Sequence, residues 1–375
     1  MPFDVQDLSG AIPGEAVAIR RYRRLVAGWL FGICGMILVM IVLGGITRLS
    51  GSGLSIMEWA PLSGTLPPLD HAEWEKLFAL YRTIPQYQLL HEGFGLAGFQ
   101  RIFWMEWVHR LWGRLIGIAF FGPLVWFWWT GRLQPSLRTG LVVIFLIGGL
   151  QGAVGWFMVA SGFFPDSTSV APYRLAIHLG LALVLYVAIL WLALGLLRPV
   201  PTASPAAGAL RRLLQGFCVL LFVTIVAGSL VAGSHAGFEY NTFPLMEGRL
   251  VPANYSRLHP WLGNLVANPA AVQFNHRLLA TLVLGVSMAL VATGFRMRLP
   301  APSRIALAVL GVLVGVQYLL GVATLLEVVP LPLAVIHQAN AVLVLTAAVV
   351  ALHGVRPTRK VSVQSQPGML SHTAG

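Results

Sequence analysis

Apolar runs long enough to cross a membrane recur along this chain of 375 residues. A hydrocarbon core of roughly 30 Å requires about 20 predominantly apolar residues when they form a helix. The pattern therefore predicts an all-α integral membrane protein with eight transmembrane helices. Their approximate ranges are 25–46, 103–129, 139–160, 174–197, 212–233, 274–295, 304–326 and 333–354.

The composition agrees with this pattern, because 57% of the residues are hydrophobic and only 10% are charged. The net charge of +12 would fit nucleic-acid binding, but Lys and Arg concentrate in alternate connections between the apolar runs. Such alternation is typical of loops on the cytoplasmic side. We therefore expect both termini in the cytoplasm and no nucleic-acid partner. The acidic residues Asp4, Asp7 and Glu15 are unlike a mitochondrial transit peptide, which favours a bacterial cytoplasmic (inner) membrane.

The chain repeats itself weakly, which predicts two four-helix halves. The pair His109-Arg110 recurs as His276-Arg277, Gln151 recurs as Gln317, and His178 recurs as His337. Four spans in each half give both halves the same orientation in the membrane. The predicted division is a cytoplasmic tail (1–24), an N-terminal half (25–197), a cytoplasmic linker (198–211), a C-terminal half (212–354) and a C-terminal tail (355–375).

Four histidines occupy matched positions near the outer ends of the even-numbered helices: His109, His178, His276 and His337. A single buried histidine is often a packing residue, but packing does not explain imidazoles at matched positions in both halves. Two imidazoles from separate helices match the axial ligation of a haem iron. Zinc or copper is the competing ligand. Cys34 and Cys218 lie alone in apolar runs and are interpreted as packing residues.

One ionisable residue distinguishes the two predicted sites. Glu106 precedes His109 by three residues and so shares a helix face with it, whereas Gln273 stands at the same place before His276. Glu106 pairing with Arg110 on the helix surface is the simpler interpretation. A carboxylate at only one site instead favours proton-coupled chemistry there, so the N-terminal half is the predicted catalytic one, with Glu106 and His109 as its catalytic residues.

Arginines follow two of the histidines directly. Arg110 and Arg277 are candidates to bind haem propionates, because a guanidinium binds a carboxylate through two parallel hydrogen bonds. For Arg114, a position at the outer membrane interface is an equally good interpretation.

Residues outside these sites receive simpler interpretations. His71, His91, His235, His259, His353 and His372 have no matched partner, and we expect them in solvent or packed in loops. The stretch 73–82 has helical spacing and is a candidate interfacial helix over the first site. The aromatic residues around it also fit an ordinary aromatic belt.

Several of these stretches resemble the haem A synthase family, and the resemblance covers about 40–355. The stretches are GGITRLSGSGLS at 44–55, WMEWVHRLWGR at 104–114, QGAVGWFMV at 151–159, PYRLAIH at 172–178, YNTFPLM at 240–246, QFNHRL at 273–278 and HQAN at 337–340. The chain is similar to the branch that lacks a cysteine pair in the first outer loop.

The resemblance implies oxidation of the C8 methyl group of haem O in two steps to the formyl group of haem A, for cytochrome oxidase biogenesis. It implies that His109 and His178 bind the iron of the substrate haem O. It likewise implies that His276 and His337 bind the iron of a haem b cofactor. Expected partners are the haem O synthase that supplies the substrate, an unidentified electron donor and membrane lipid, with a homo-oligomer left open.

Two other classes of function compete with this interpretation. A di-haem b-type cytochrome would transfer electrons without changing its haem, and a haem transporter or chaperone would release haem unmodified. The same-orientation repeat and the difference between Glu106 and Gln273 favour an enzyme.

Overall fold

The computed structural model of the chain describes residues 13–197, 208–297 and 299–356, with side chains from residue 17 onward. Most of the two predicted tails and of the linker, at 1–12, 198–207 and 357–375, therefore lies outside the described residues. His372, Asp4 and Asp7 lie outside them as well.

Eight of the described helices are long and apolar enough to cross a membrane, which confirms the predicted number. They are α1 (Pro13–Leu49), α4 (Leu96–Trp129), α5 (Pro135–Val159), α6 (Pro172–Leu197), α7 (Gly208–Gly233), α9 (Pro269–Arg296), α10 (Ala301–Leu326) and α11 (Leu331–Gly354). Proline opens several of them, as its fixed φ and missing N–H suit a first helical turn. No strand occurs among the described residues, so the all-α prediction is confirmed for them.

Two helices extend beyond their apolar runs. Helix α1 begins at Pro13 rather than near residue 25. Helix α4 begins at Leu96, about two turns before its apolar run, because Phe99 and Ile102 bury their side chains in the segment that lies against the start of this helix.

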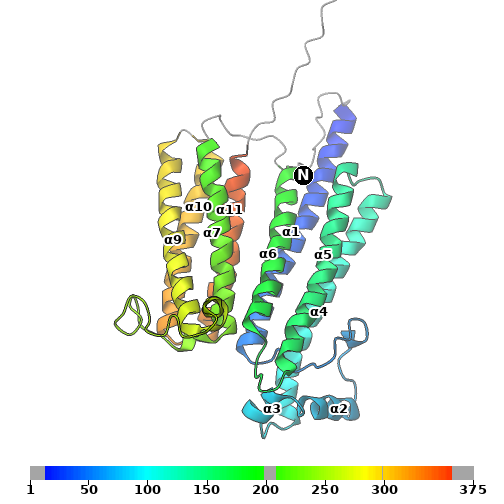
Figure 1. Cartoon of the computed structure of the whole chain (residues 1–375). Helices are drawn as coiled ribbons and strands as arrows, with labels where there is room; N and C mark the ends of the chain where they lie inside the picture. Colours follow the sequence, from blue (N-terminus) through cyan, green and yellow to red (C-terminus); the bar gives the residue numbers. More distant parts are fainter. Residues whose placement is uncertain (1–12, 198–207, 298, 357–375) are drawn as a thin grey trace, which may run out of the picture.

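The shorter helices gather at one end of the long ones (Figure 1). After α1 come η1 (Ser63–Thr65), α2 (His71–Tyr81) and α3 (Pro85–Leu90); α5 is followed by η2 (Ala160–Phe163), and α7 by η4 (Ala236–Phe238), η5 (Trp261–Gly263) and α8 (Asn264–Ala267). Helix α2 confirms the helix expected around 73–82. Asp70 caps it by accepting from the amide of Glu73 at 2.8 Å, while Glu73 accepts from the amide of Leu69 at 2.8 Å.

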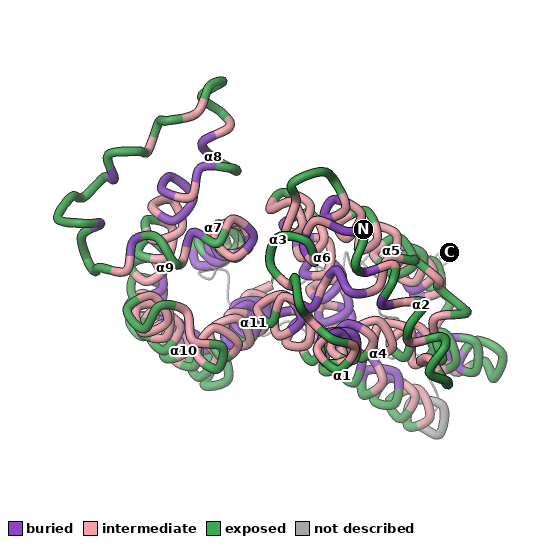
Figure 2. Tube along the Cα trace, turned by 90° about the horizontal axis from the view of Figure 1, so that it is seen from below, coloured by how far each residue is buried: buried purple, intermediate pink, exposed green. Residues whose placement is uncertain are grey.

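The long helices pack in two groups (Figures 1 and 2). Helices α1, α4, α5 and α6 contact one another, and so do α7, α9, α10 and α11. The groups meet where α6 contacts α7 and α1 contacts α11. A 2.7 Å hydrogen bond between the hydroxyls of Tyr186 and Thr346 crosses this boundary. A single cluster of buried apolar side chains runs through both groups.

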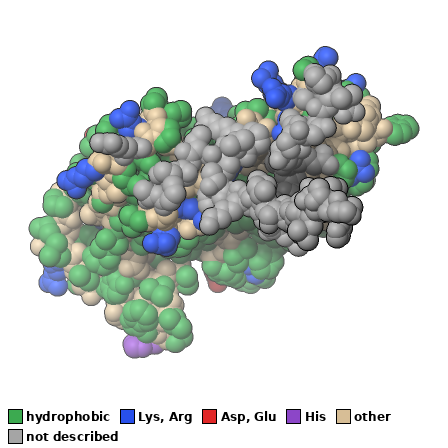
Figure 3. All heavy atoms as spheres, turned by 90° about the horizontal axis from the view of Figure 1, so that it is seen from above, with side chains coloured by type: hydrophobic (Ala, Val, Ile, Leu, Met, Phe, Trp, Pro, Cys, Tyr) green, Lys and Arg blue, Asp and Glu red, His purple; other side chains and the backbone are tan. Residues whose placement is uncertain are grey.

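The outer surface of the long helices is apolar, as contact with lipid requires. Large hydrophobic side chains such as Ile118, Met288 and Leu319 are more than 60% exposed there. Lys and Arg side chains are prominent on the face opposite α2 and α3, and Asp and Glu are scarce in that view (Figure 3).

The segment 50–95, called the cap below, covers the end of α4. Its apolar and aromatic side chains pack against the start of α4, where Tyr81 of the cap and Phe99 of α4 are fully buried. The Tyr81 hydroxyl bonds to Gln86 at 3.0 Å and to Nδ1 of His91 at 2.6 Å, and the Gln86 amide donates to the carbonyl of Gly51 at 3.0 Å. This polar chain ties α2 and α3 to the segment that leaves α1.

Candidate functional site

The four matched histidines lie on α4, α6, α9 and α11, in the halves of these helices nearer to the cap and to the segment that follows α7. The imidazoles of His109 and His178 are close enough to interact electrostatically. The same holds for His276 and His337. The structure therefore brings each predicted pair together, one pair in each group of helices.

Glu106 is 2% exposed, and all of its partners come from α4 or the cap. Its Oε1 accepts from Nε of Arg110 at 3.0 Å and from Nη2 at 2.6 Å. Its Oε2 accepts from the Ser55 hydroxyl at 2.7 Å and from the Ile56 amide at 3.0 Å. Arg110 also donates to the carbonyls of Ile56 and Glu58, both at 2.7 Å. Glu106 and Arg110 thus fasten the cap to the helix that carries His109.

The second group of helices contains a matching set of hydrogen bonds, which fastens the segment after α7 to the helix that carries His276. Each of the two sets is called a latch below. Arg277 donates to the carbonyls of Tyr240 and Thr242, at 2.6 and 2.8 Å, and to Oε1 of Gln273 at 2.7 Å. Gln273 in turn donates to the carbonyl of Ala236 at 2.6 Å. The two arginines therefore hold equivalent backbone segments, one with a carboxylate beside it and one with a neutral amide.

Arg110 uses all three of its guanidinium nitrogens in these contacts, whereas Nε of Arg277 is buried without a partner among the described residues. Propionate binding by either residue stays a prediction. Arg114 is fastened in a similar way, because it donates to the carbonyls of Ala60 and Pro61, both at 2.9 Å. All three arginines have a structural role in holding the loops that follow α1 and α7.

Each histidine also packs against a glycine on a neighbouring long helix. A Cβ built on Gly44 would lie 3.1 Å from Nε2 of His109. A Cβ on Gly155, Gly228 or Gly321 would lie 2.9 Å from Cε1 of His178, His276 or His337, respectively. Real Cβ atoms essentially never come within 3.0 Å of a heavy atom, and the 3.1 Å distance at Gly44 is also tighter than most real contacts. The glycines thus provide space for imidazoles, which differs from the helix contacts or tight turns that glycines in helices usually allow.

The second pair of histidines is the more firmly held. Nδ1 of His276 lies 3.1 Å from the carbonyl of Thr224. Because a carbonyl only accepts, this contact requires a proton on Nδ1 and leaves Nε2 with the lone pair that binds a metal. His109 forms no comparable hydrogen bond with any residue that the structure describes.

Glutamines contact the remaining two imidazoles. The amide nitrogen of Gln151 lies 3.2 Å from Nδ1 of His178, and that of Gln317 lies 3.1 Å from Nδ1 of His337. Asn340 donates to Oε1 of Gln317 at 2.8 Å, whereas Oε1 of Gln151 is buried without a partner among the described residues.

The side chains around each histidine pair indicate which group the pair would hold. Within the described ranges, no three His, Cys, Asp or Glu side chains gather as a protein-only zinc or copper site requires. Two imidazoles from separate helices, close enough to interact and each beside a glycine, fit a planar haem whose iron takes two axial ligands.

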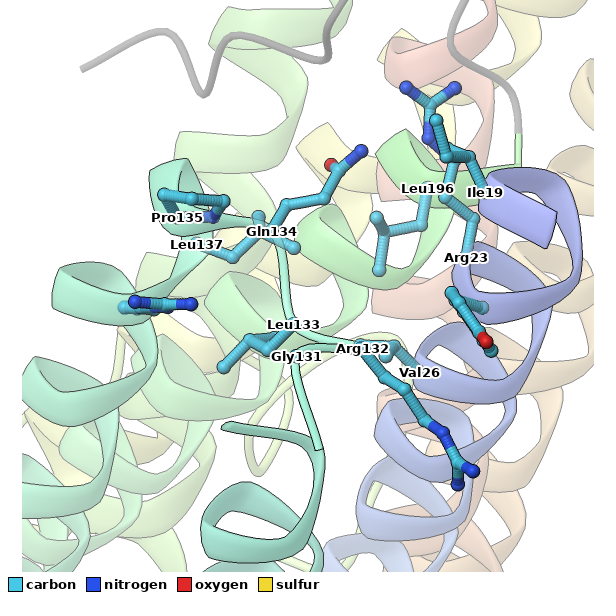
Figure 4. A pocket seen from close by; sticks show the side chains of 12 residues that line it. Ile19, Arg23, Val26, Gly131, Arg132, Leu133, Gln134, Pro135, Leu137 and Leu196 are labelled. Atoms are coloured by element: carbon cyan, nitrogen blue, oxygen red, sulfur yellow. The ribbon is translucent and has the colours of Figure 1, made fainter. Parts of the chain in front are cut away.

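Two cavities found among the described residues lie away from the histidines. One, of about 250 Å³, is lined by α1, the α4–α5 turn and the end of α6, with Arg23, Arg132 and Gln134 at its walls (Figure 4). The other, of about 330 Å³, lies along residues 161–173. Neither is lined by any of the four matched histidines, so the evidence for a haem site comes from the side-chain geometry around these histidines.

The remaining histidines vary in their surroundings. His71 is exposed, and His91 stacks on Phe94 at 4.2 Å. Burial lowers the pKa values of His91 and His235, and for His235 the nearby Arg48 adds to this effect. The expectation for His353 is wrong: this residue is 2% exposed inside α11 and packs edge-on against Trp191. Its place near the end of the sequence concealed a position inside the final transmembrane helix.

Sequence reasoning missed Ser55, Thr224 and Asn340 as partners of the site residues. Comparing the repeats would have singled out Asn340, which stands three residues after His337 where Leu181 stands three residues after His178. No such signal exists for Thr224, because it acts through its backbone carbonyl.

Residues 27–349 match the family model described as "Cytochrome oxidase assembly protein" (COX15-CtaA). The chain belongs to this family. It is 57% identical over 337 residues to a protein of Granulibacter bethesdensis named "Heme A synthase", covering 90% of this chain and 89% of that protein. It is 49% identical over 343 residues to "Heme A synthase 2" of Acidiphilium cryptum, covering 90% of this chain and 93% of the relative. A "Heme A synthase" of Rhodospirillum centenum is 49% identical, with 89% of each chain covered.

Proposed function

We propose that this protein is a haem A synthase, an oxidoreductase that converts the C8 methyl group of haem O to a formyl group. The observation that carries the proposal is the pair of matched latches, which differ in one ionisable group beside otherwise similar histidine pairs. The names of the close relatives support the same activity.

His109 and His178 are the proposed ligands of the substrate iron. They come from helices of the same group, and Gly44 and Gly155 leave space beside them. Glu106 lies one helical turn from His109 and keeps a carboxylate near the substrate, where it can accept a proton as the methyl group is oxidised. Arg110, Ser55 and Ile56 hold that carboxylate in one orientation. Glu106 and His109 are accordingly the proposed catalytic residues.

His276 and His337 are the proposed ligands of the resident haem b, which supplies one-electron transfer when bound. The Thr224 carbonyl keeps His276 in the tautomer that coordinates through Nε2. Gln317, held by Asn340, contacts His337 through its amide nitrogen, which lies 3.1 Å from Nδ1 and 3.3 Å from Nε2; haem binding through Nε2 would displace the second of these contacts. Gln273 offers no ionisable group at this second site.

We further propose that the protein lies in a bacterial inner membrane as two tandem four-helix halves of the same orientation. The division at 25–197 and 212–354 is supported by the contacts within each group of helices. The arginine-rich face supports cytoplasmic termini. The four histidines then lie toward the outer, periplasmic side. A haem O synthase would supply the substrate, an electron donor would complete the reaction, and a homo-oligomer is compatible with this scheme.

The experiment is to purify the full chain from cells that make haem O and to identify the haems extracted from it by chromatography and mass. Haem O with hydroxylated and formyl products is the expected result, and His178→Ala should abolish the products. The exposed His71→Ala variant serves as the control and should retain them. Haem B alone, reduced reversibly by quinol, would instead identify a di-haem cytochrome. Haem released without modification would identify a transporter.

A further inference from the structure

Arg48, near the end of α1, has an unusual environment for an arginine. Its side chain is partly buried, and Nη2 is fully buried with no hydrogen-bond partner. Throughout the described part of the chain, no residue forms a hydrogen bond or ion pair with its guanidinium.

The arginines close to the matched histidines differ from Arg48 because their side chains donate several hydrogen bonds. Arg110 donates four hydrogen bonds, Arg277 three and Arg114 two, all to backbone carbonyls or to the side chains of Glu106 and Gln273. Nη1 of Arg114 and Nε of Arg277 are also buried without a partner, but each of these arginines is held by at least two hydrogen bonds, whereas the guanidinium of Arg48 forms none with the described residues.

A buried guanidinium N–H group without a partner is unfavourable, because it has lost its water and the guanidinium cannot shed its proton. Proteins usually offset this loss with a carboxylate or phosphate. Since the described residues provide neither beside Arg48, its environment indicates a missing anion.

The surroundings of Arg48 indicate where this anion lies. Arg48 is close enough to His235, in the segment that follows α7, to interact with it electrostatically. One helical turn earlier on α1, Gly45 packs against Gln338, the residue after His337. Arg48 thus belongs to the first half by sequence and lies where α1 meets the second half.

We propose that Arg48 binds a carboxylate of the haem held by His276 and His337, one of the two propionates that every haem of this type carries. This inference rests on the proposed function only in requiring a haem at the second site. Arg48 then completes the second site from the first half of the chain, and it replaces Arg277 as the principal propionate ligand.

The test combines a change in the protein with a change in the haem, using the full-length chain. All variants also carry His109→Ala, so that the haem observed is the one bound at the second site. Wild-type Arg48 and Arg48→Gln are each reconstituted with haem b or with its dimethyl ester, and the dissociation constant of each haem is measured. With haem b, Arg48→Gln should weaken binding by roughly tenfold or more, because the propionate loses a charged hydrogen-bond donor. With the ester, the same substitution should have a much smaller effect, since the partner of Arg48 has lost its charge.

Two further variants make the result specific. Arg48→Lys keeps the charge and should restore most of the wild-type affinity for haem b. Arg82→Gln, a change at an exposed arginine of the cap, should leave the affinity unchanged. Equal losses of affinity for haem b and its ester, or no loss for either, would overturn the proposal. Failure of the wild-type chain to bind haem at His276 and His337 would refute the proposed function, which is a separate outcome.

Discussion

Asn340 donates a 2.8 Å hydrogen bond to the side-chain carbonyl of Gln317, and this bond has no equivalent in the first half of the chain. Asn340 is itself held by the carbonyl of Leu313 at 3.2 Å. Leu181 occupies the corresponding place beside Gln151 and offers no donor. Asn340 therefore fixes the carbonyl end of the amide that contacts His337, whereas the Gln151 amide is held only at its nitrogen, by Nδ1 and the backbone carbonyl of His178.

Replacing Asn340 with Leu should weaken the second site. The substitution leaves the Gln317 carbonyl buried without a donor, which costs about 1–3 kcal/mol. We expect a lower thermal midpoint and a changed spectrum of the second haem, with the first-site haem unaffected. Absorption spectra during thermal unfolding of the purified protein measure both effects.

The complementary variant Leu181→Asn is the control for this prediction. It supplies the donor that the Gln151 carbonyl lacks, so it should stabilise the contact with His178 and slow exchange of added imidazole at the first haem. Faster exchange in Leu181→Asn would contradict the interpretation of the two amides.

Glu106→Gln should separate the two roles of this residue. Gln273 occupies the same position in the second latch and keeps its bond to Arg277, so glutamine is compatible with this geometry. We expect the variant to fold and bind haem but to oxidise haem O at least ~100-fold more slowly, the usual contribution of a general acid or base. Product formation in single turnovers gives the rate.

Ser55→Ala is the matched control for Glu106→Gln. It removes one of the hydrogen bonds to Oε2 but keeps the charge of Glu106. Its rate should fall by less than that of Glu106→Gln, because Ile56 and Arg110 still hold the carboxylate in place. A rate in Glu106→Gln equal to that of wild type would remove Glu106 from the catalytic residues.

The transmembrane helices were predictable because lipid imposes one simple requirement, a long apolar run, that any sequence must satisfy. The pairing of His109 with His178 was predictable because the repeat presents each ligand twice. The cap was predicted only as far as α2, since its packing depends on Tyr81, Phe99 and Gln86, which contact one another only after the chain folds back on α4.

The environment of a side chain was harder to predict than its place along the chain. Glycines such as Gly155 and Gly321 fit ordinary helix packing in sequence, and only the structure reveals the imidazole beside each of them. Arg48 likewise follows a glycine-rich stretch at the end of an apolar run, where an arginine usually reaches water. The absence of a partner is a property of the folded surroundings and leaves no trace in the sequence.

Gly321→Ala should disturb the second haem, because its Cβ would lie 2.9 Å from the His337 ring. We expect a changed low-spin electron paramagnetic resonance spectrum and lower haem retention. Gly315→Ala on the same helix is the matched control, as no atom lies within 4 Å of its Cβ. There, alanine should leave the spectrum unchanged and stabilise the helix by about 0.5–1 kcal/mol. Identical spectra for both variants would contradict the role assigned to Gly321.

The cap should lose stability as the pH falls below about 6.5, the ordinary pKa of histidine. Burial lowers the pKa of His91. The opened cap therefore binds a proton at a higher pH than the closed cap, and acid favours opening. Hydrogen exchange of residues 71–91, corrected for the intrinsic effect of pH, measures this stability.

His91→Phe should largely remove the pH dependence while weakening the cap at all pH values, since it also loses the bond to Tyr81. His71→Gln changes an exposed histidine and should leave the dependence intact. An unaltered dependence in His91→Phe would assign the effect to another group.

The contact between Gly45 and Gln338 connects the two histidine pairs mechanically. Gly45 follows Gly44, which packs against His109, and Gln338 follows His337. Gln338 also donates to the carbonyl of Ile41 at 2.6 Å. The residue next to Gly44 and the residue next to His337 are therefore in direct contact, so α1 and α11 are joined at the level of both histidine pairs.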